Sequence, residues 1–202
     1  MAYAGLFALK SKIYAYNDII ANCGYYAVAL LVGGEYEFYH STIANYWGNY
    51  MSKTRTTSSL VISNVLKIGQ SDGSDKLYLG DLKQAFFGNC IVFGNNQKEV
   101  EIAKNEEKEF NYSFDHCILQ LPDTFNTSNK AHFKEIWKGD KFDPKFVDPY
   151  EELNYALDTL SPAKDAGSSE IAKMFQADIM NKSRSSDSGP DLGAFERIEK
   201  KK

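Results

Sequence analysis

Several features that define particular protein classes are scarce in this sequence. It has three cysteines, too few for a disulfide scaffold and without C-x-x-C metal spacing, so Cys23, Cys90 and Cys117 are expected to be buried free thiols. A net charge of −4 does not suit a protein that binds nucleic-acid phosphates. The longest apolar run, Tyr25–Gly34, is far shorter than the roughly 20 residues of a membrane-spanning helix. It is interpreted as a buried strand, and no membrane-spanning segment is expected.

The residues that are abundant indicate a β-rich globular protein. Phe, Tyr and Trp make up 14% of the chain and only five residues are proline, a bias that favours strands. The 202 residues suffice for one domain or for a portion of a larger one. Residues Met1–Lys10 lack the basic start and the cleavage site of a signal peptide. Because strand-like sequence begins almost at Met1, we expect an export signal upstream of this chain.

The most informative feature is a degenerate repeat in residues 1–122. Similar short segments recur, each with Asn or His at its third position and mostly apolar residues two positions before and after it. The recurring positions are spaced 23, 24, 25 and 27 residues apart, and they are Asn17, His40, Asn64, Asn89 and His116. Alternation with period 2 places the Asn or His position and the two flanking positions on one face of a strand. A second strand precedes most of these segments and is separated from the Asn or His position by a turn rich in Gly, Lys and Glu.

This repeat predicts an all-β fold, a right-handed parallel β-helix (solenoid) of about five coils. Asn tolerates the left-handed backbone of a tight corner, and its amide can donate to and accept from neighbours about 4.8 Å apart. We therefore expect the Asn and His positions to form one stacked structural ladder that faces the interior. Cys90 and Cys117 fall in one column and are expected to be stacked thiols rather than a disulfide.

Two segments depart from the repeat. Residues Tyr46–Ser59 are polar where a strand is expected, and we interpret them as a protruding loop that carries binding residues, Arg55 among them. The turn Ser71–Asp75 has two carboxylates near a glycine, which makes calcium a candidate, but it lacks the spacing and the terminal Glu of an EF-hand loop. An ordinary turn is favoured, so no cofactor is expected.

The repeat fades after Pro122, and residues 123–202 are interpreted as a capping region. Phe133, Ile136 and Trp137 have helical spacing behind a possible Ser128 cap, so the sequence predicts a short helix over Ser128–Trp137. A second short helix is predicted after Ser168 and Ser169. Both would cover one end of the stack.

The capping region resembles a known family. The resemblance lies in these segments and residues: Asp143–Asp148 (DPKFVD), Tyr155–Leu157, Ser161–Gly167 (SPAKDAG), Asp178, Arg184 and Gly189–Glu196 (GPDLGAFE). Their order is similar to the terminal signature of bacterial right-handed parallel β-helix proteins labelled choice-of-anchor Q. The resemblance implies an exported protein, secreted or attached to the bacterial cell surface and often a lipoprotein. Physically, Gly167 and Gly193 permit tight turns, and Asp165, Asp191 and Glu196 can accept hydrogen bonds from the backbone or from Arg184.

Two classes of function remain open. In the first, the chain is a non-catalytic surface scaffold whose exposed aromatic rings stack on sugars or whose surface binds a cell-surface protein. The candidate binding residues are Tyr16, Tyr39, Tyr46, Trp47 and Arg55; the alternative is that these aromatics pack beneath loops or against a portion of the protein upstream of this chain. In the second, the chain is the C-terminal portion of a polysaccharide lyase or a glycoside hydrolase. No column stacks Lys, Arg or carboxylates as such a site requires, so no catalytic residue is assigned.

Overall fold

Parallel strand pairing dominates the computed structural model, which describes residues 2–47 and 55–199. Its ten-stranded main sheet is accompanied by two short antiparallel pairs, β6–β7 and β13–β14. The elements are β1 (Ala4–Tyr16), β2 (Ile19–Ala21), β3 (Tyr26–Tyr39), β4 (Thr42–Asn45), β5 (Leu60–Ser63), β6 (Val65–Gly69), β7 (Asp75–Leu79), β8 (Leu82–Gly88), β9 (Ile91–Gly94), β10 (Val100–Ala103), β11 (Ser113–Leu119), β12 (Phe133–Lys138), the 3-10 turn η1 (Asp140–Phe142), β13 (Phe146–Asp148), β14 (Asn154–Leu157) and α1 (Ser169–Ala172).

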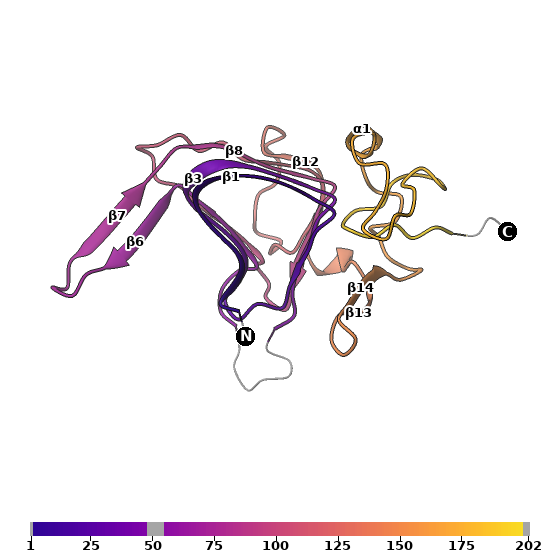
Figure 1. The fold of residues 1–202 in the computed structure, drawn as a ribbon, viewed down its shortest axis with the longest axis horizontal. Helices are drawn as coiled ribbons and strands as arrows, with labels where there is room; N and C mark the ends of the chain where they lie inside the picture. The colour runs from indigo at the N-terminus through magenta and orange to yellow at the C-terminus, as the bar shows by residue number, and fades with distance from the viewer. Residues whose placement is uncertain (1, 48–54, 200–202) are drawn as a thin grey trace.

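Neighbouring strands in the main sheet come from successive passes of the chain along one path. β1 pairs in parallel with β3 over nearly its whole length. The first half of β3 then pairs with β5 and its second half with β8, and β11 and β12 continue the sheet. The passes overlie one another in Figure 1 because each repeats the same bends. The predicted all-β class is confirmed, and the main sheet is parallel.

An antiparallel hairpin interrupts one of these passes. β6 and β7 pair with each other and project to the left in Figure 1. The tip of the hairpin is the calcium candidate, where Asp72 Oδ1 accepts hydrogen bonds from Ser74 N (2.9 Å) and Ser74 Oγ (2.6 Å). Both bonds are internal to the turn. Within residues 2–47 and 55–199, no three or more His, Cys, Asp or Glu side chains gather in a way that could hold a metal.

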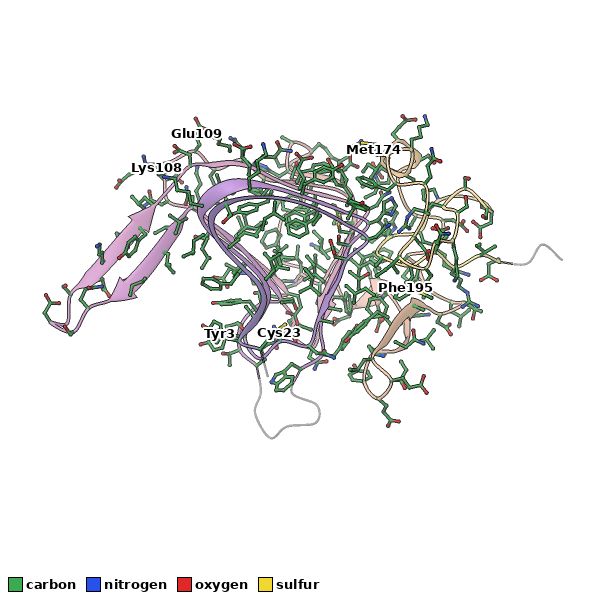
Figure 2. The ribbon with its side chains drawn as sticks, viewed as in Figure 1. Tyr3, Cys23, Lys108, Glu109, Met174 and Phe195 are labelled. Carbon is green, nitrogen blue, oxygen red and sulfur yellow. The ribbon has the colours of Figure 1, made fainter. Side chains whose placement is uncertain are left out.

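Stacked phenylalanines fill part of the interior that the passes enclose. The rings of Phe38, Phe87, Phe114 and Phe133 lie one above the next, with centroid separations of 5.1, 4.9 and 5.8 Å. Figure 2 shows side chains occupying the space that the strands enclose. Phe38, Phe87 and Phe114 each lie two positions before an Asn or His of the repeat, as Ile62 does before Asn64. Ile62 is not part of this stack, because its strand pairs it with Leu30 instead of Phe38.

Left-handed backbone marks the same corner of successive passes. Asn17, His40, Asn89 and His116 have φ values of 56°, 44°, 53° and 52°, and Glu135 follows with φ 48°. The register of the strands before and after these residues aligns each one with the next. We call these five residues the corner column. The tight corner that the Asn and His pattern predicted is therefore present at four of its five positions.

Asn64 is the exception, and its assignment to the column was wrong. It lies at the start of the hairpin, where its Nδ2 donates to Asn105 O (2.8 Å) and its Oδ1 accepts from Asn105 N (2.6 Å). The hairpin (residues 65–79) and residues 46–59 both lengthen one pass, so the corner residue after His40 is Asn89. The regular spacing through Asn64 is thus coincidental.

The predicted helix over Ser128–Trp137 is also wrong, because this region contains β12, which pairs in parallel with β11. A left-handed corner residue shifts the strand alternation by one position, so residues three apart across the corner face the same side. Phe133 and Ile136 flank Glu135 in this way, and Phe114 and Cys117 flank His116. The second predicted helix is confirmed as α1, whose N-cap Ser168 accepts the Ile171 N–H.

The C-terminal segment lies beside the sheet, at the right of Figure 1. It carries β13, β14 and α1 and ends in irregular structure. Cys23, Cys90 and Cys117 are buried free thiols, as predicted. No helix in the described part of the chain is long and apolar enough to cross a membrane.

Candidate functional site

Asn89, a member of the corner column, binds the C-terminal segment instead of facing the interior. Asn89 Oδ1 accepts the Ser168 N–H at 2.7 Å, and Asn89 Nδ2 lies 3.1 Å from Ser168 O and 3.0 Å from His40 Nε2. The Asn89 carbonyl accepts the Gly193 N–H at 2.8 Å. The predicted inward orientation is therefore wrong for Asn89, whose side chain joins the sheet to residues that lie far along the sequence.

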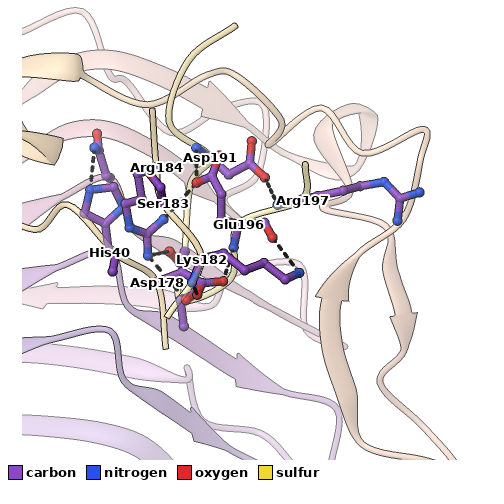
Figure 3. Close-up of polar contacts among 12 residues, drawn as sticks. His40, Asp178, Lys182, Ser183, Arg184, Asp191, Glu196 and Arg197 are labelled. Carbon is purple, nitrogen blue, oxygen red and sulfur yellow. Dashed lines mark hydrogen bonds and ion pairs between the residues drawn. The ribbon is translucent and has the colours of Figure 1, made fainter. Parts of the chain in front are cut away.

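Arg184 makes the second connection at this corner. Its guanidinium donates to Asn17 Oδ1 (2.9 Å) and to the carbonyls of Gly193 (3.2 Å) and Ala194 (3.3 Å), and it lies 3.3 Å from Glu196 Oε2. Arg184 is only 2% exposed. Figure 3 shows this buried cluster, in which Arg184 lies between His40 and the acidic residues of the C-terminal segment.

Acidic side chains in the same cluster hold the C-terminal turns. Asp191 accepts the N–H groups of Asp165 (2.8 Å) and Arg197 (2.6 Å). Asp178 accepts the N–H of Lys182 (2.7 Å) and, through its other oxygen, that of Glu196 (2.7 Å). The structural role expected for Asp191 and Glu196 is confirmed by these contacts.

Burial shifts the pKa values of three groups around Arg184. Desolvation lowers the pKa of His40 to about 2, and the Arg184 charge acts in the same direction, so the imidazole is neutral. Desolvation raises the pKa of Glu196 to about 8, with the Asp191 charge adding to it, although Arg184 opposes the shift. Desolvation likewise raises the pKa of Asp191 to about 6. His40 is fully buried, so it is not placed to exchange protons with a surface ligand.

The two remaining members of the corner column lie away from this cluster. His116 Nδ1 is 2.5 Å from Asp115 Oδ1, and Lys134 Nζ is 3.0 Å from the other oxygen of that carboxylate. Glu135 is exposed. The C-terminal segment therefore contacts the column at Asn17, His40 and Asn89.

Among the candidate binding residues, Tyr16 alone is exposed by about half. Its side chain is 52% exposed and that of the neighbouring Tyr14 is 56% exposed. The Tyr16 ring stacks on Phe175 with centroids 5.0 Å apart. Tyr39 is directed outward from the sheet as predicted but is buried, because Phe175 covers it at 4.9 Å. We call Tyr14 and Tyr16 the tyrosine platform.

A shallow hollow of about 280 Å³ adjoins the tyrosine platform. It is lined by Leu6, Tyr14, Ala15, Tyr16, Asp18 and Ile20. Burial raises the pKa of the Asp18 carboxyl. Among the described residues, no side-chain donor or backbone N–H bonds to this carboxylate, so it is available to accept hydrogen bonds from a ligand.

The other candidate binding residues are not arranged for binding. Tyr46 is buried and packs on Tyr150 and Tyr155. Arg55 is also buried, and its guanidinium forms an ion pair with Glu99 at 2.5 Å. Trp47 is half-buried, and residues 48–54 of the predicted loop lie outside the described residues. Arg55 is thus a structural residue, contrary to the binding role assigned from its polar surroundings.

A larger cavity of about 500 Å³ lies within the C-terminal segment. It is lined by Ser169, Ala172, Lys173, Gln176, Ser183, Arg184, Ser185, Asp187, Ser188, Gly189 and Pro190. None of these residues was a candidate binding residue. The only signal in the sequence was the density of Ser and Gly residues before Pro190, which is typical of an irregular loop.

Comparison with known proteins adds no assignment, because no family model, no curated protein and no solved structure matches this chain.

Proposed function

We propose that this chain is a non-catalytic carbohydrate-facing module with the architecture of a right-handed parallel β-helix of about five coils. The parallel register of successive passes and the left-handed residues at one corner support this architecture. The order of motifs in residues 143–196 supports membership of the choice-of-anchor Q group, and with it a location outside the bacterial cell or on its surface. The coils would extend through β12 (Phe133–Lys138), which pairs in parallel with β11, and the C-terminal segment lies beside them.

The tyrosine platform is the observation that carries the carbohydrate assignment. Two half-exposed tyrosine rings present flat apolar surface and phenolic hydroxyls, and the free Asp18 carboxylate lies in the same hollow. Sugar rings bind through apolar contact with aromatic faces and through hydrogen bonds from their hydroxyls to a few well-placed polar groups. Packing of Phe175 behind Tyr16 holds the ring in place and lowers the entropy cost of binding.

The buried cluster around Arg184 favours a binding role over catalysis. Its carboxylates bond to backbone N–H groups or to Arg184, and His40 is enclosed. A general acid or base must be within reach of the substrate. These groups are therefore committed to structure, and no cofactor is proposed.

Binding to a panel of soluble and insoluble polysaccharides tests the assignment. The double variant Tyr14→Ala/Tyr16→Ala is expected to weaken binding by roughly tenfold or more, because two stacking surfaces are lost. Tyr78→Ala is the matched control, since Tyr78 is an exposed tyrosine on the distant hairpin. Equal binding by the double variant and the wild type would contradict the proposal.

Two outcomes of the same experiment separate the alternatives. Absorbance from unsaturated uronate products on incubation with polyuronates would show that the chain belongs to a polysaccharide lyase. Absence of glycan binding would favour a protein-binding role.

A further inference from the structure

The cavity within the C-terminal segment has the size and the wall chemistry of a small-molecule site. Its volume of about 500 Å³ lies within the roughly 300–1,000 Å³ that is typical of ligand pockets. One wall is the turn that contains α1 and continues to Gln176, and the other is the loop from Ser183 to Pro190. The buried side chains of Ala172 and Pro190 supply apolar surface.

Hydrogen-bonding groups of both kinds line this cavity. Lys173 is a donor whose ion pair with Glu170 is largely exposed and therefore weak, so its ammonium can turn to a ligand. The Asp187 carboxylate accepts the Glu199 N–H through Oδ2 (3.1 Å), whereas Oδ1 is buried and has no hydrogen-bond partner in the described part of the chain. The hydroxyls of Ser183 and Ser185 lie 3.1 Å apart and bond to each other.

The charges around the cavity nearly cancel. Lys173 and Asp187 carry opposite charges in its wall. Arg184 also contributes to the wall, but its guanidinium bonds to Asn17, Glu196 and main-chain carbonyls, and Asp178 and Asp191 lie close enough to act on its charge. Its Nε is the one guanidinium nitrogen without a partner among the described residues. This balance favours an uncharged ligand with many hydroxyl groups over an anion.

We propose that this cavity binds a single uncharged sugar unit. The ligand's hydroxyls would donate to the Asp187 carboxylate and accept from Lys173, and the apolar face of its ring would contact Ala172 and Pro190. The inference rests on the proposed carbohydrate-facing function and adds a second site to it. One segment serves both sites, because Phe175 supports the tyrosine platform while Lys173 and Gln176 line the cavity.

Amide chemical-shift titration with glucose, galactose and N-acetylglucosamine tests this site, with glucuronate and glycerol as comparison ligands. At least one uncharged sugar is expected to shift the amides of Ser183, Ser185 and Asp187 saturably. Asp187→Asn is expected to weaken that binding by roughly tenfold, because a charge-assisted hydrogen bond is lost while the Glu199 N–H keeps its acceptor. Asp75→Asn on the hairpin is the matched control and should leave the affinity unchanged.

Each contrary outcome overturns the proposal in a recognisable way. Shifts caused only by glucuronate would show that the cavity prefers an anion, and equal shifts with glycerol would show a lack of sugar recognition. An unchanged affinity in Asp187→Asn would place the ligand elsewhere. Tyr16→Ala should leave the monosaccharide titration unchanged while weakening polysaccharide binding, so failure of the cavity site and failure of the tyrosine platform are distinguishable.

Discussion

Replacement of Asn89 tests the central structural claim, that the corner column holds the C-terminal segment. Its side chain contacts Ser168 N, Ser168 O and His40 Nε2 at 2.7, 3.1 and 3.0 Å. Leucine at this position would leave these buried polar groups without partners. Each such loss costs about 1–3 kcal/mol, although neighbouring losses do not add in full. Leucine at φ 53° would also cost about 1–2 kcal/mol of backbone strain.

We therefore expect Asn89→Leu to lower the free energy of unfolding by about 3–5 kcal/mol. Asn89→Gly removes the same hydrogen bonds without the backbone strain, so its loss should be smaller, about 1–3 kcal/mol. Urea unfolding followed by circular dichroism measures both values. In thermal unfolding, each kcal/mol should lower the Tm by about 2–4 °C for a chain of this size.

Limited proteolysis distinguishes detachment of the C-terminal segment from a general loss of stability. If Asn89 joins the sheet to the C-terminal segment, cleavage within residues 168–199 should accelerate in Asn89→Leu before the sheet unfolds. Asn64→Leu is the comparison variant, since Asn64 holds the loop at Asn105 instead. A free energy of unfolding for Asn89→Leu within about 0.5 kcal/mol of the wild type would refute the reasoning.

The remaining predictions concern pH and the close approach at Gly193. Burial lowers the pKa of His40 from 6.5 to about 2, so its contribution to stability is complete above pH 6.5, and the wild type should lose stability relative to His40→Asn as the pH falls below that value. Burial raises the pKa of Glu196 from 4.5 to about 8, so the contribution of Glu196 to stability is complete below pH 4.5. Relative to Glu196→Gln, the wild type should lose this stability as the pH rises through 8. Urea midpoints that change in parallel with pH in the wild type and either variant would contradict the corresponding assignment. Gly193→Ala should destabilise the fold by about 1–3 kcal/mol or more, since φ is +83° and a Cβ would lie 2.6 Å from Thr42 Oγ1. Gly73→Ala, with φ +80° and open space, isolates the backbone strain, and equal urea midpoints in the two variants would show that the clash is absent.

The strand content and most of the corner positions can be predicted from the sequence, because both follow from local chemistry. Asn is enriched at left-handed positions, and this preference alone marks Asn17 and Asn89 as corner residues. Glu135 occupies the same corner without such a preference, so no residue-type signal could identify it. Asn64 was misassigned because strand register, which decides membership of the column, depends on tertiary pairing that spacing alone does not encode.

The surface residues are harder to predict for a different reason. Alternation along β3 correctly directs Tyr39 outward, but exposure depends on what later covers it, and Phe175 comes from a segment far along the chain. Arg55 is followed by a polar run typical of a loop, yet it finds Glu99 and becomes buried. Arg184 was expected to bond to acidic residues of the signature, and it does lie 3.3 Å from Glu196, but its bond to Asn17 was not expected. Its contact with Asn17 joins residues 167 positions apart, a separation that no local pattern in the sequence encodes.

The corner column also links stability to the two proposed sugar sites. Ser168, which Asn89 holds through both its N–H and its carbonyl, is the N-cap of α1. Phe175 lies just beyond that helix and packs behind Tyr16, and Lys173 lines the cavity. Loss of the Asn89 contacts would therefore free the segment that positions both sites. Docking of the C-terminal segment to the corner column therefore positions the side chains of both proposed sites.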